Sequence, residues 1–336
     1  MKDIDKNVEV YAHAGSIPNQ CSVSTDGHGM CSIPIAVPPG TNKLQPKLSL
    51  LYASDHENSL LGIGWRLTGL SAITRVGQTM AQDNNWTAVN YTNTDRFELD
   101  GQRIMLSSLD SEQDTYYHTE IESWLKIVPE SDGSIDGPSG FTVTTKDGKI
   151  MQYGMDSAQT SRIMAVGKNA VRVWALNQIE DQYGNYMTIS YINDYVTGSY
   201  IPDKIEYTGN KNANITPQRS VSFGYEDRSD TINRYQGGCA VTHKKRLKTI
   251  TTFLDGNLIL TYTLDYHYGE RSGFSQLASV TLTDAKGVSL PATSFEWQTN
   301  DTELFKPAQV LTSPTAIPYQ PVQSFTIDVN GNGLND

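Results

Sequence analysis

The residues with the clearest chemical pattern occupy the last nine positions of the sequence, Asp328–Asp336, which read DVNGNGLND. Oxygen-bearing side chains at positions 1, 3 and 5 of this segment, a glycine at position 6 and a main-chain carbonyl at position 7 suit a hard cation such as Ca2+. These positions match the start of an EF-hand loop, but the sequence has no twelfth loop residue to supply the bidentate glutamate. The predicted calcium ligands are Asp328, Asn330, Asn332, Asp336 and the carbonyl of Leu334.

The same segment has a second interpretation, a polar Asn/Gly turn that binds no ion. Even for a calcium loop, we expect weak or absent binding in this chain, because the ligands need the remainder of their own fold to hold them. A fold rarely ends in the middle of such a loop, so we expect the sequence to be the front part of a longer protein. Ca2+ at this loop is the only cofactor that the sequence predicts.

Candidate catalytic residues give weaker patterns. Gly62–Gly69 superficially resembles a phosphate-binding loop, but its third glycine falls two residues late and the bulky Trp65 would crowd a phosphate. We therefore predict a packed strand and turn around Trp65. Glu120 and Glu122 match the two-glutamate pattern of some ADP-ribosyltransferases, but alternate residues on one strand face produce that pattern by chance. The sequence thus predicts no catalytic residue.

Histidine and cysteine positions indicate neither a zinc site nor a disulfide framework. No two of the six histidines have the four-residue spacing that binds zinc on a helix. Cys21 and Cys31 flank a turn signal and would face each other across a hairpin, where a disulfide needs an oxidising compartment. We favour two free thiols there, with the paired state as the alternative. Cys239 is predicted to be a small core or turn residue.

Length and charge limit the class of protein. A chain of 336 residues with 38% hydrophobic content can bury a large core. The net charge of −11 argues against a nucleic-acid partner, which requires a basic surface. No apolar run is long enough to span a bilayer, and the first residues lack the apolar stretch of a secretory signal. We expect either a cytosolic start or export by a route without a conventional signal peptide.

Strand periodicity dominates the sequence and helical periodicity is rare. Short runs that alternate apolar and polar residues, such as Phe141–Thr145, are bounded by turn residues. Asp100-Gly101, Asp147-Gly148 and Asp255-Gly256 each separate two such runs, as hairpin loops do. The sequence therefore predicts an all-β fold of extended antiparallel hairpin sheets with little helix.

Proline spacing predicts the domain boundaries. Pro314, Pro318 and Pro321 fall within one short segment, which indicates an extended linker. We predict a β domain over residues 1–310, a linker over residues 311–322 and a truncated calcium-binding repeat over residues 323–336.

A series of apparently structural motifs, in a fixed order, resembles the SpvB-type domain over roughly residues 15–300. The motifs are Ser32–Gly40, Leu44–Leu50, Leu61–Leu67, Phe97–Gly101, Trp174–Leu176, Phe223–Tyr225, Arg246–Ile250 and Leu290–Phe295. This domain forms the amino-terminal region of the B component of insecticidal Tc toxin complexes. The nine-residue calcium pattern in turn resembles loops of FG-GAP/VCBS-type β-propellers, which commonly follow it.

The resemblance implies that this chain is part of a toxin complex. In Tc-type members the domain is similar to Rhs/YD-repeat proteins and forms part of a hollow β-shell around a toxic carboxyl-terminal cargo. The implied partners are the rest of the shell, the propeller and the other toxin-complex subunits, and the implied location is extracellular after a cytoplasmic stage. The family that this chain resembles also includes a plasmid-encoded virulence protein. Its ADP-ribosyltransferase activity lies in a separate carboxyl-terminal domain, so that activity does not carry over to this chain.

Three classes of function follow. The first is a non-catalytic shell segment of a secreted toxin complex, and the second is a cell-surface adhesion or binding module built from the same domain. The third is an enzyme on an all-β scaffold, for example a glycan hydrolase with two carboxylates at a suitable separation. The resemblance favours the first class.

Overall fold

The structure, a computed structural model, describes residues 15–107 and 116–298. One compact unit comprises Met1–Glu296, and a second comprises Trp297–Asp336. Only residues 297 and 298 of the second unit are described, so the predicted linker and the predicted calcium loop lie outside the described residues. The predicted boundary at residue 310 therefore stays a prediction.

An antiparallel sheet of four strands begins the described chain, with the strands in sequence order. Its strands are β1 (Gln20–Val23), β2 (Gly29–Pro34), β3 (Ser49–Ala53) and β4 (Trp65–Thr68), and the 3-10 turn η1 (Thr41–Lys43) interrupts the β2–β3 connection. Cys21 lies directly opposite Cys31 in the β1–β2 register, and the two form a disulfide. The preference for free thiols is wrong, because register places both side chains on one face at bonding distance.

Eight further strands close into an antiparallel barrel. They are β5 (Ala72–Val76), β6 (Arg96–Leu99), β7 (Gln102–Leu106), β8 (Tyr117–Thr119), β9 (Lys126–Glu130), β10 (Gly140–Thr144), β11 (Ile150–Tyr153) and β13 (Val171–Glu180). The pairings β11–β13 and β13–β5 close the ring. The short strand β12 (Arg162–Met164) pairs with β13, and the helix α1 (Met80–Asp83) lies in the β5–β6 connection.

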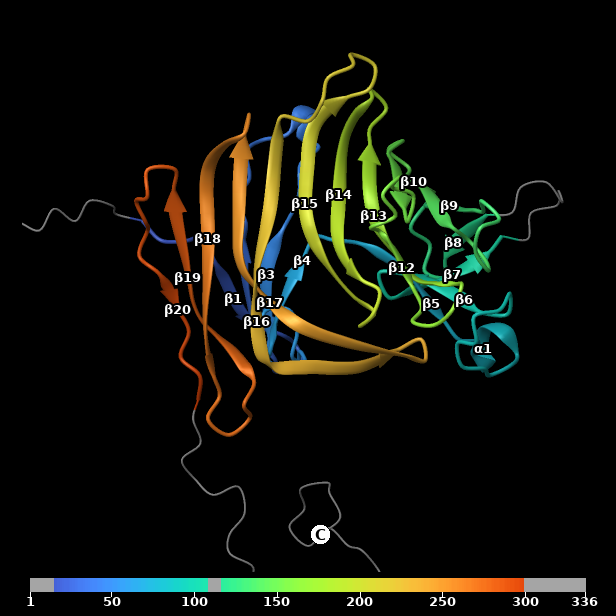
Figure 1. The fold of residues 1–336 in the computed structure, drawn as a ribbon, viewed down its shortest axis with the longest axis horizontal. Helices are drawn as coiled ribbons and strands as arrows, with labels where there is room; N and C mark the ends of the chain where they lie inside the picture. Colours follow the sequence, from blue (N-terminus) through green and yellow to red (C-terminus); the bar gives the residue numbers. More distant parts are fainter. Residues whose placement is uncertain (1–14, 108–115, 299–336) are drawn as a thin grey trace, which may run out of the picture. The chain divides into compact units, whose positions relative to one another are not determined.

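The strand β13 also begins a long antiparallel sheet, so it belongs to both structures. Residues 173–175 pair with β5 of the barrel, whereas residues 178–180 pair with β14. The sheet continues, in sequence order, through β14 (Asn185–Asp194), β15 (Ser199–Asn210), β16 (Arg219–Gln236), β17 (Cys239–Leu254), β18 (Asn257–Tyr268), β19 (Ser275–Asp284) and β20 (Thr293–Ser294). Figure 1 shows these strands side by side, with the barrel strands beyond β13.

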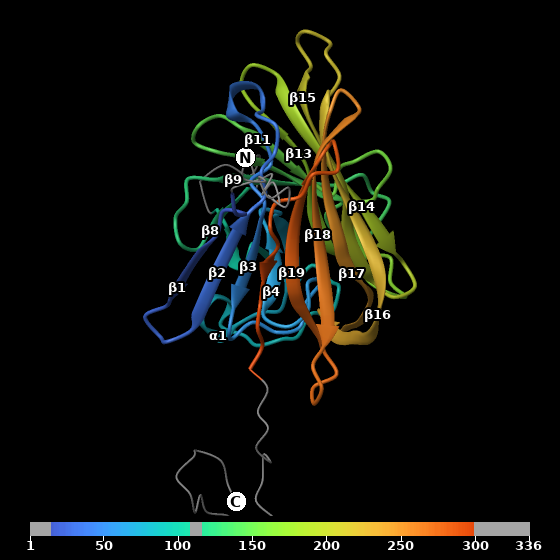
Figure 2. The same cartoon turned by 90° about the vertical axis from the view of Figure 1, so that its left-hand side faces the viewer.

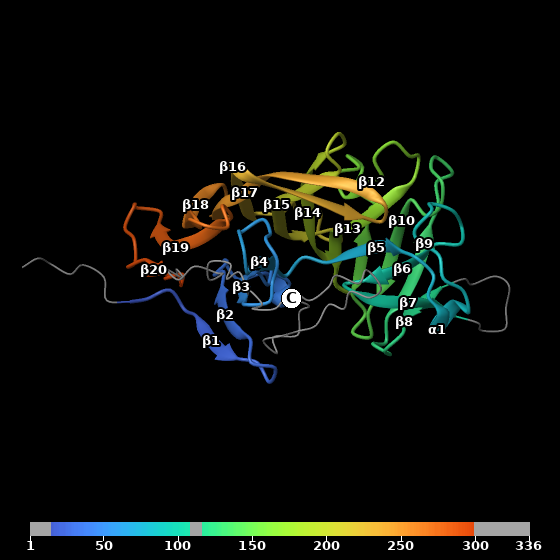
Figure 3. The same cartoon turned by 90° about the horizontal axis from the view of Figure 1, so that it is seen from below.

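The four-stranded sheet packs against one face of the long sheet, which Figures 2 and 3 show from two directions. Trp65 on β4 is 2% exposed, and its ring lies 4.7 Å from that of Phe295. Two tyrosines of the long sheet bond to the β2–β3 connection: Tyr262 Oη accepts the Ala36 N–H at 2.9 Å and Tyr207 Oη donates to the Pro38 carbonyl at 2.8 Å. Buried apolar area between the sheets forms the core of this half.

The predicted all-β fold is confirmed, and its turns have the predicted chemistry. Asp100 and Gly101 both have positive φ, as do Asp255 and Gly256, which two-residue hairpin turns of the primed types require. Helix is confined to α1 and η1 within the described ranges. No helix in residues 15–107 and 116–298 is both long and apolar enough to cross a bilayer.

Candidate functional site

An arginine lies inside the barrel. Arg75 lies two residues after Ile73 on β5, so both side chains lie on the same face of the strand, the one that points into the barrel. Arg75 is 4% exposed. Its guanidinium carbon lies 5.5 Å from the ring centres of both Phe97 and Trp174. With Phe141, these rings form an edge-to-face cluster with centroid separations of 5.0–5.4 Å. The arginine therefore caps an aromatic core through cation–π contacts.

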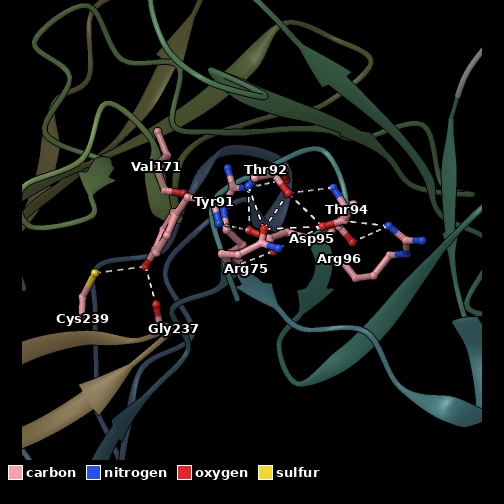
Figure 4. A network of polar contacts seen from close by, with 10 residues as sticks. Arg75, Tyr91, Thr92, Thr94, Asp95, Arg96, Val171, Gly237 and Cys239 are labelled. Atoms are coloured by element: carbon pink, nitrogen blue, oxygen red, sulfur yellow. Dashed lines mark hydrogen bonds and ion pairs between the residues drawn. The ribbon is translucent and has the colours of Figure 1, made fainter. Parts of the chain in front are cut away.

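A buried carboxylate compensates the charge of this arginine. Nη1 of Arg75 donates to Oδ2 of Asp95 at 3.1 Å, and Nε donates to the Val171 carbonyl at 3.0 Å (Figure 4). Asp95 has no exposed side-chain area and also accepts the main-chain N–H groups of Asn90 and Tyr91, at 3.0 and 2.7 Å. The pair is thus satisfied on the carboxylate side, as a buried ion pair must be.

The same network ties the barrel to the long sheet. The hydroxyl of Tyr91 donates to the Gly237 carbonyl at 2.6 Å and lies 3.1 Å from Sγ of Cys239 (Figure 4). Burial, together with the Cys239 thiol, raises the pKa of Tyr91 well above its usual value, so the phenol stays protonated and donates. Gly237 and Gly238 form the tip of the β16–β17 hairpin with positive φ, so this tip docks onto the β5–β6 connection.

A cavity of about 480 Å3 opens at the mouth of the barrel beside Arg75. Phe97, Ile104 and Pro129 provide apolar wall, whereas Asp83 and Arg96 stand among its polar lining. The Asp83 carboxylate is itself paired with Arg96, at 2.7 Å, and with Arg103. Nη2 of Arg75 is buried and has no hydrogen-bond partner among the described residues.

A second buried ion pair joins the four-stranded sheet to the long sheet. Arg228 and Asp230 lie in a bulge of β16 and contact each other at 2.6 Å, with 0% and 4% side-chain exposure. Asp230 also accepts the hydroxyl and N–H of Ser275 on β19 and the side-chain amide of Asn58. Burial raises the pKa of Asp230, but the hydrogen bonds that its carboxylate accepts from Arg228, Ser275 and Asn58 outweigh burial. The net shift of the pKa is strongly downward. This cluster is structural in character.

The glycine-rich segment is a packed turn, as predicted. Trp65 is buried, and Gly62 adopts φ of 86° against the main chain of Ser275, with no room for a side chain. Gly64 similarly faces the ring of Tyr52.

Glu120 and Glu122 do not share a strand face, contrary to the explanation given for their spacing. They follow β8 in an exposed bend, where Glu120 accepts the side-chain amide of Gln82 and Glu122 accepts the N–H of Trp124. The structure does not bring them to the barrel cavity.

Within the described ranges, no three histidine, cysteine or acidic side chains gather closely enough to hold a metal ion. The predicted ligands Asp328, Asn330, Asn332, Leu334 and Asp336 are outside those ranges, so calcium binding there stays a prediction.

Sequence reasoning missed Arg75, Asp95 and Tyr91. One signal was present, because the alternation Ala72-Ile73-Thr74-Arg75-Val76 places an arginine on the same face as an isoleucine. Its partners come from a connection without periodicity, which no local pattern could assign.

A family described as SpvB, Salmonella virulence plasmid 65kDa B protein, matches residues 23–276. The chain belongs to the SpvB family. No curated protein matches the sequence significantly.

Solved structures related to this SpvB-family chain share its fold at low sequence identity. The crystal structure of TcdB2-TccC3 matches with a TM-score of 0.67 and 16% identity over 84% of this chain and 17% of that one. The Tc holotoxin pore of Photorhabdus luminescens gives 0.65 and 16%, over 87% and 17%. The N-terminal domain of effector protein SpvB from Salmonella typhimurium gives 0.59 and 15%, over 79% and 99%. The chain thus spans about a sixth of the Tc toxin chains.

Proposed function

We propose that this chain is a non-catalytic wall segment of a Tc-type toxin-complex protein that helps to enclose a toxin cargo. The observation that carries the proposal is the continuous sheet from β13 to β20, joined through β13 to a closed barrel, in a fold shared with Tc toxin chains. Such a sheet separates two surroundings: one face packs on the β1–β4 sheet, and the other can meet solvent or a further layer.

The edge strands of the two sheets support the proposal that this segment continues into neighbouring parts of a shell. β1 is the first strand of its sheet, and β20 pairs with β19 over only two residue pairs. Open edges of this kind pair readily with further strands. In the proposed assembly, other parts of the shell cover these edges, and the remaining toxin-complex subunits are the partners.

The buried ionisable groups support a structural role. Arg75–Asp95 and Arg228–Asp230 are buried ion pairs, and each carboxylate is held by further hydrogen bonds. Groups fixed in this manner stabilise a fold and are poorly suited to proton transfer. We therefore assign no catalytic residue to the chain.

The terminal segment completes the proposal. Residues 323–336 would begin a calcium-binding propeller repeat in the longer protein, and the complex would act outside the cell after assembly in the cytoplasm. Neither the repeat nor the location is needed for the role of the described residues.

Electron cryo-microscopy of the full-length protein, purified with its cargo-bearing partner, tests the proposal. Residues 15–298 should form part of the wall of a hollow shell, and the cargo should resist added protease until the shell is opened. A map that places this segment outside a closed shell, or cargo digested equally fast with and without the segment, would refute it.

A further inference from the structure

A cavity of about 380 Å3 lies where the β2–β3 connection crosses the long sheet. Strands β11, β13, β14 and β15 provide its floor, and residues 43–47 and 69–71 provide its walls. The connection is fixed in place, because Nδ2 of Asn42 donates to Oδ2 of Asp181, in the β13–β14 turn, at 3.0 Å. The volume lies within the range of about 300–1,000 Å3 that is usual for small-molecule sites.

The floor of this cavity is apolar because strand register aligns apolar side chains. Met151 lies opposite Ile179 in the β11–β13 pairing, and Ile179 lies opposite Met187 in the β13–β14 pairing. Ile189, two residues after Met187 on the same strand face, lies opposite Ile205. Met187, Ile189 and Ile205 are buried, whereas Met151 and Ile179 remain partly exposed. A ligand in the cavity can therefore contact the side chains of Met151 and Ile179.

The charged groups around the cavity are mostly positive. Lys43, Lys47 and Lys149 all line it, and the first two are exposed. Lys149 pairs with an aspartate of its own hairpin, but neither Lys43 nor Lys47 forms an ion pair among the described residues. The only carboxylate in the lining, Asp100, accepts the hydroxyl of Ser71 and a main-chain N–H, at 2.7 and 3.0 Å. Two accessible ammonium groups thus stand above an apolar floor.

We propose that this cavity binds the aliphatic chain of a medium-chain carboxylic acid, with the carboxylate at the ammonium groups of Lys43 and Lys47. The chain contacts Leu70, Met151 and Ile179, which are partly exposed lining residues. Removal of the chain from water drives binding, and the two lysines select an anionic head group. The site is independent of the proposed wall function, since all its parts belong to the described chain itself.

Titration of the full chain with octanoate, followed by ligand-observed NMR and calorimetry, tests the site. Octanoate should bind saturably with a dissociation constant of about 1 mM or lower, which is reasonable for a ligand of this size. Butanoate should bind at least about ten-fold more weakly, because it buries fewer methylene groups. Octylamine has the same chain but a positive head group, and it should bind at least about five-fold more weakly than octanoate because the lysines repel it.

A charge-reversed variant tests the role of the lysines. Lys43→Glu combined with Lys47→Glu should reverse the preference, so that octylamine binds more tightly than octanoate. Lys244→Glu combined with Lys286→Glu is the matched control, because it changes the net charge equally at two exposed lysines that do not line the cavity. The control should keep the preference for octanoate. All four positions are exposed, so both variants should fold.

A bulky substitution locates the bound chain. Leu70→Trp should reduce octanoate binding at least about ten-fold by filling the cavity, whereas Leu258→Trp, at an exposed position on β18, should leave it unchanged. If Leu70→Trp lacks the native circular dichroism spectrum, the charge-reversal comparison decides alone. The proposal is overturned by an absence of saturable octanoate binding, by equal binding of octanoate and octylamine, or by an unchanged preference in the Lys43/Lys47 variant.

Discussion

Single buried residues in this fold have their charges compensated by a partner of opposite charge. Arg75 and Asp95 are both nearly inaccessible, and each satisfies most of its polar atoms through the other and through the main chain. Because a lone buried charge is far more costly than a paired one, removing either partner should affect stability much more than removing an exposed pair.

Asp95→Asn should lower the free energy of unfolding by about 3–5 kcal/mol, since it leaves the guanidinium of Arg75 without a counter-charge. Asp227→Asn is the matched control, because Asp227 pairs with Lys245 at the surface and its side chain is 86% exposed. That control should cost no more than about 1 kcal/mol. Urea denaturation followed by tryptophan fluorescence measures both, and similar losses in the two variants would contradict the ion-pair account.

His243 should make the fold sensitive to mild acid. Burial, with the nearby charges of Arg234, Arg172 and Arg228, lowers its pKa to about 4, whereas the unfolded side chain titrates near 6.5. The unfolded state therefore binds the proton first, so stability is complete above about pH 6.5 and falls as the pH decreases toward 4.

The loss should approach about 3 kcal/mol at pH 4, given about 1.4 kcal/mol for each unit of difference in pKa. His243→Gln should remove that component, so its melting temperature should fall less than that of the unmodified chain between pH 7 and pH 5. Identical pH profiles for the two proteins would show that His243 does not titrate in this manner.

At the scale of elements, tight connections matter because they hold one sheet against the other. Gly62 lies in the β3–β4 connection, where the Ile63 N–H donates to the Ser275 carbonyl of β19 at 2.9 Å. Its close approach leaves no space for a side chain: a Cβ would lie 2.3 Å from the Ser275 oxygen. The turn glycine Gly256 has a similar φ of 77° but faces open space.

Gly62→Ala should therefore destabilise the fold more than Gly256→Ala. The control should lose about 1–2 kcal/mol, the usual cost of a positive φ for a residue with a Cβ. The Gly62 variant adds the displacement of a main-chain contact between two sheets, and its loss should exceed that of the control by at least about 1 kcal/mol. Chemical denaturation of both variants measures the difference, and equal losses would rule out the steric explanation.

At the scale of the whole molecule, the open edges should govern association. Among the described strands, β1 lies at the edge of its sheet, and Val23 on it is 72% exposed. An exposed edge with an apolar residue favours pairing with another chain, and a lysine on such an edge opposes it.

Val23→Lys should shift the chain toward monomer in sedimentation-velocity experiments. Val196→Lys is the matched control, because Val196 is 85% exposed and lies in the turn between β14 and β15, two strands that pair with each other. It should leave the distribution of species unchanged. A chain that is monomeric at every concentration, or equal effects of the two lysines, would argue against edge pairing.

Strand alternation and turn chemistry are local properties, so the all-β class, the hairpin turns and the packed Trp65 segment could be predicted from the sequence alone. Membership of the SpvB family was likewise readable from ordered motifs. The folded arrangement was needed to show that β13 belongs to both the barrel and the long sheet, that Cys21 and Cys31 are bonded, and that Arg75 pairs with Asp95. Register and partner choice depend on residues distant in the chain, and no local pattern encodes which of them meet.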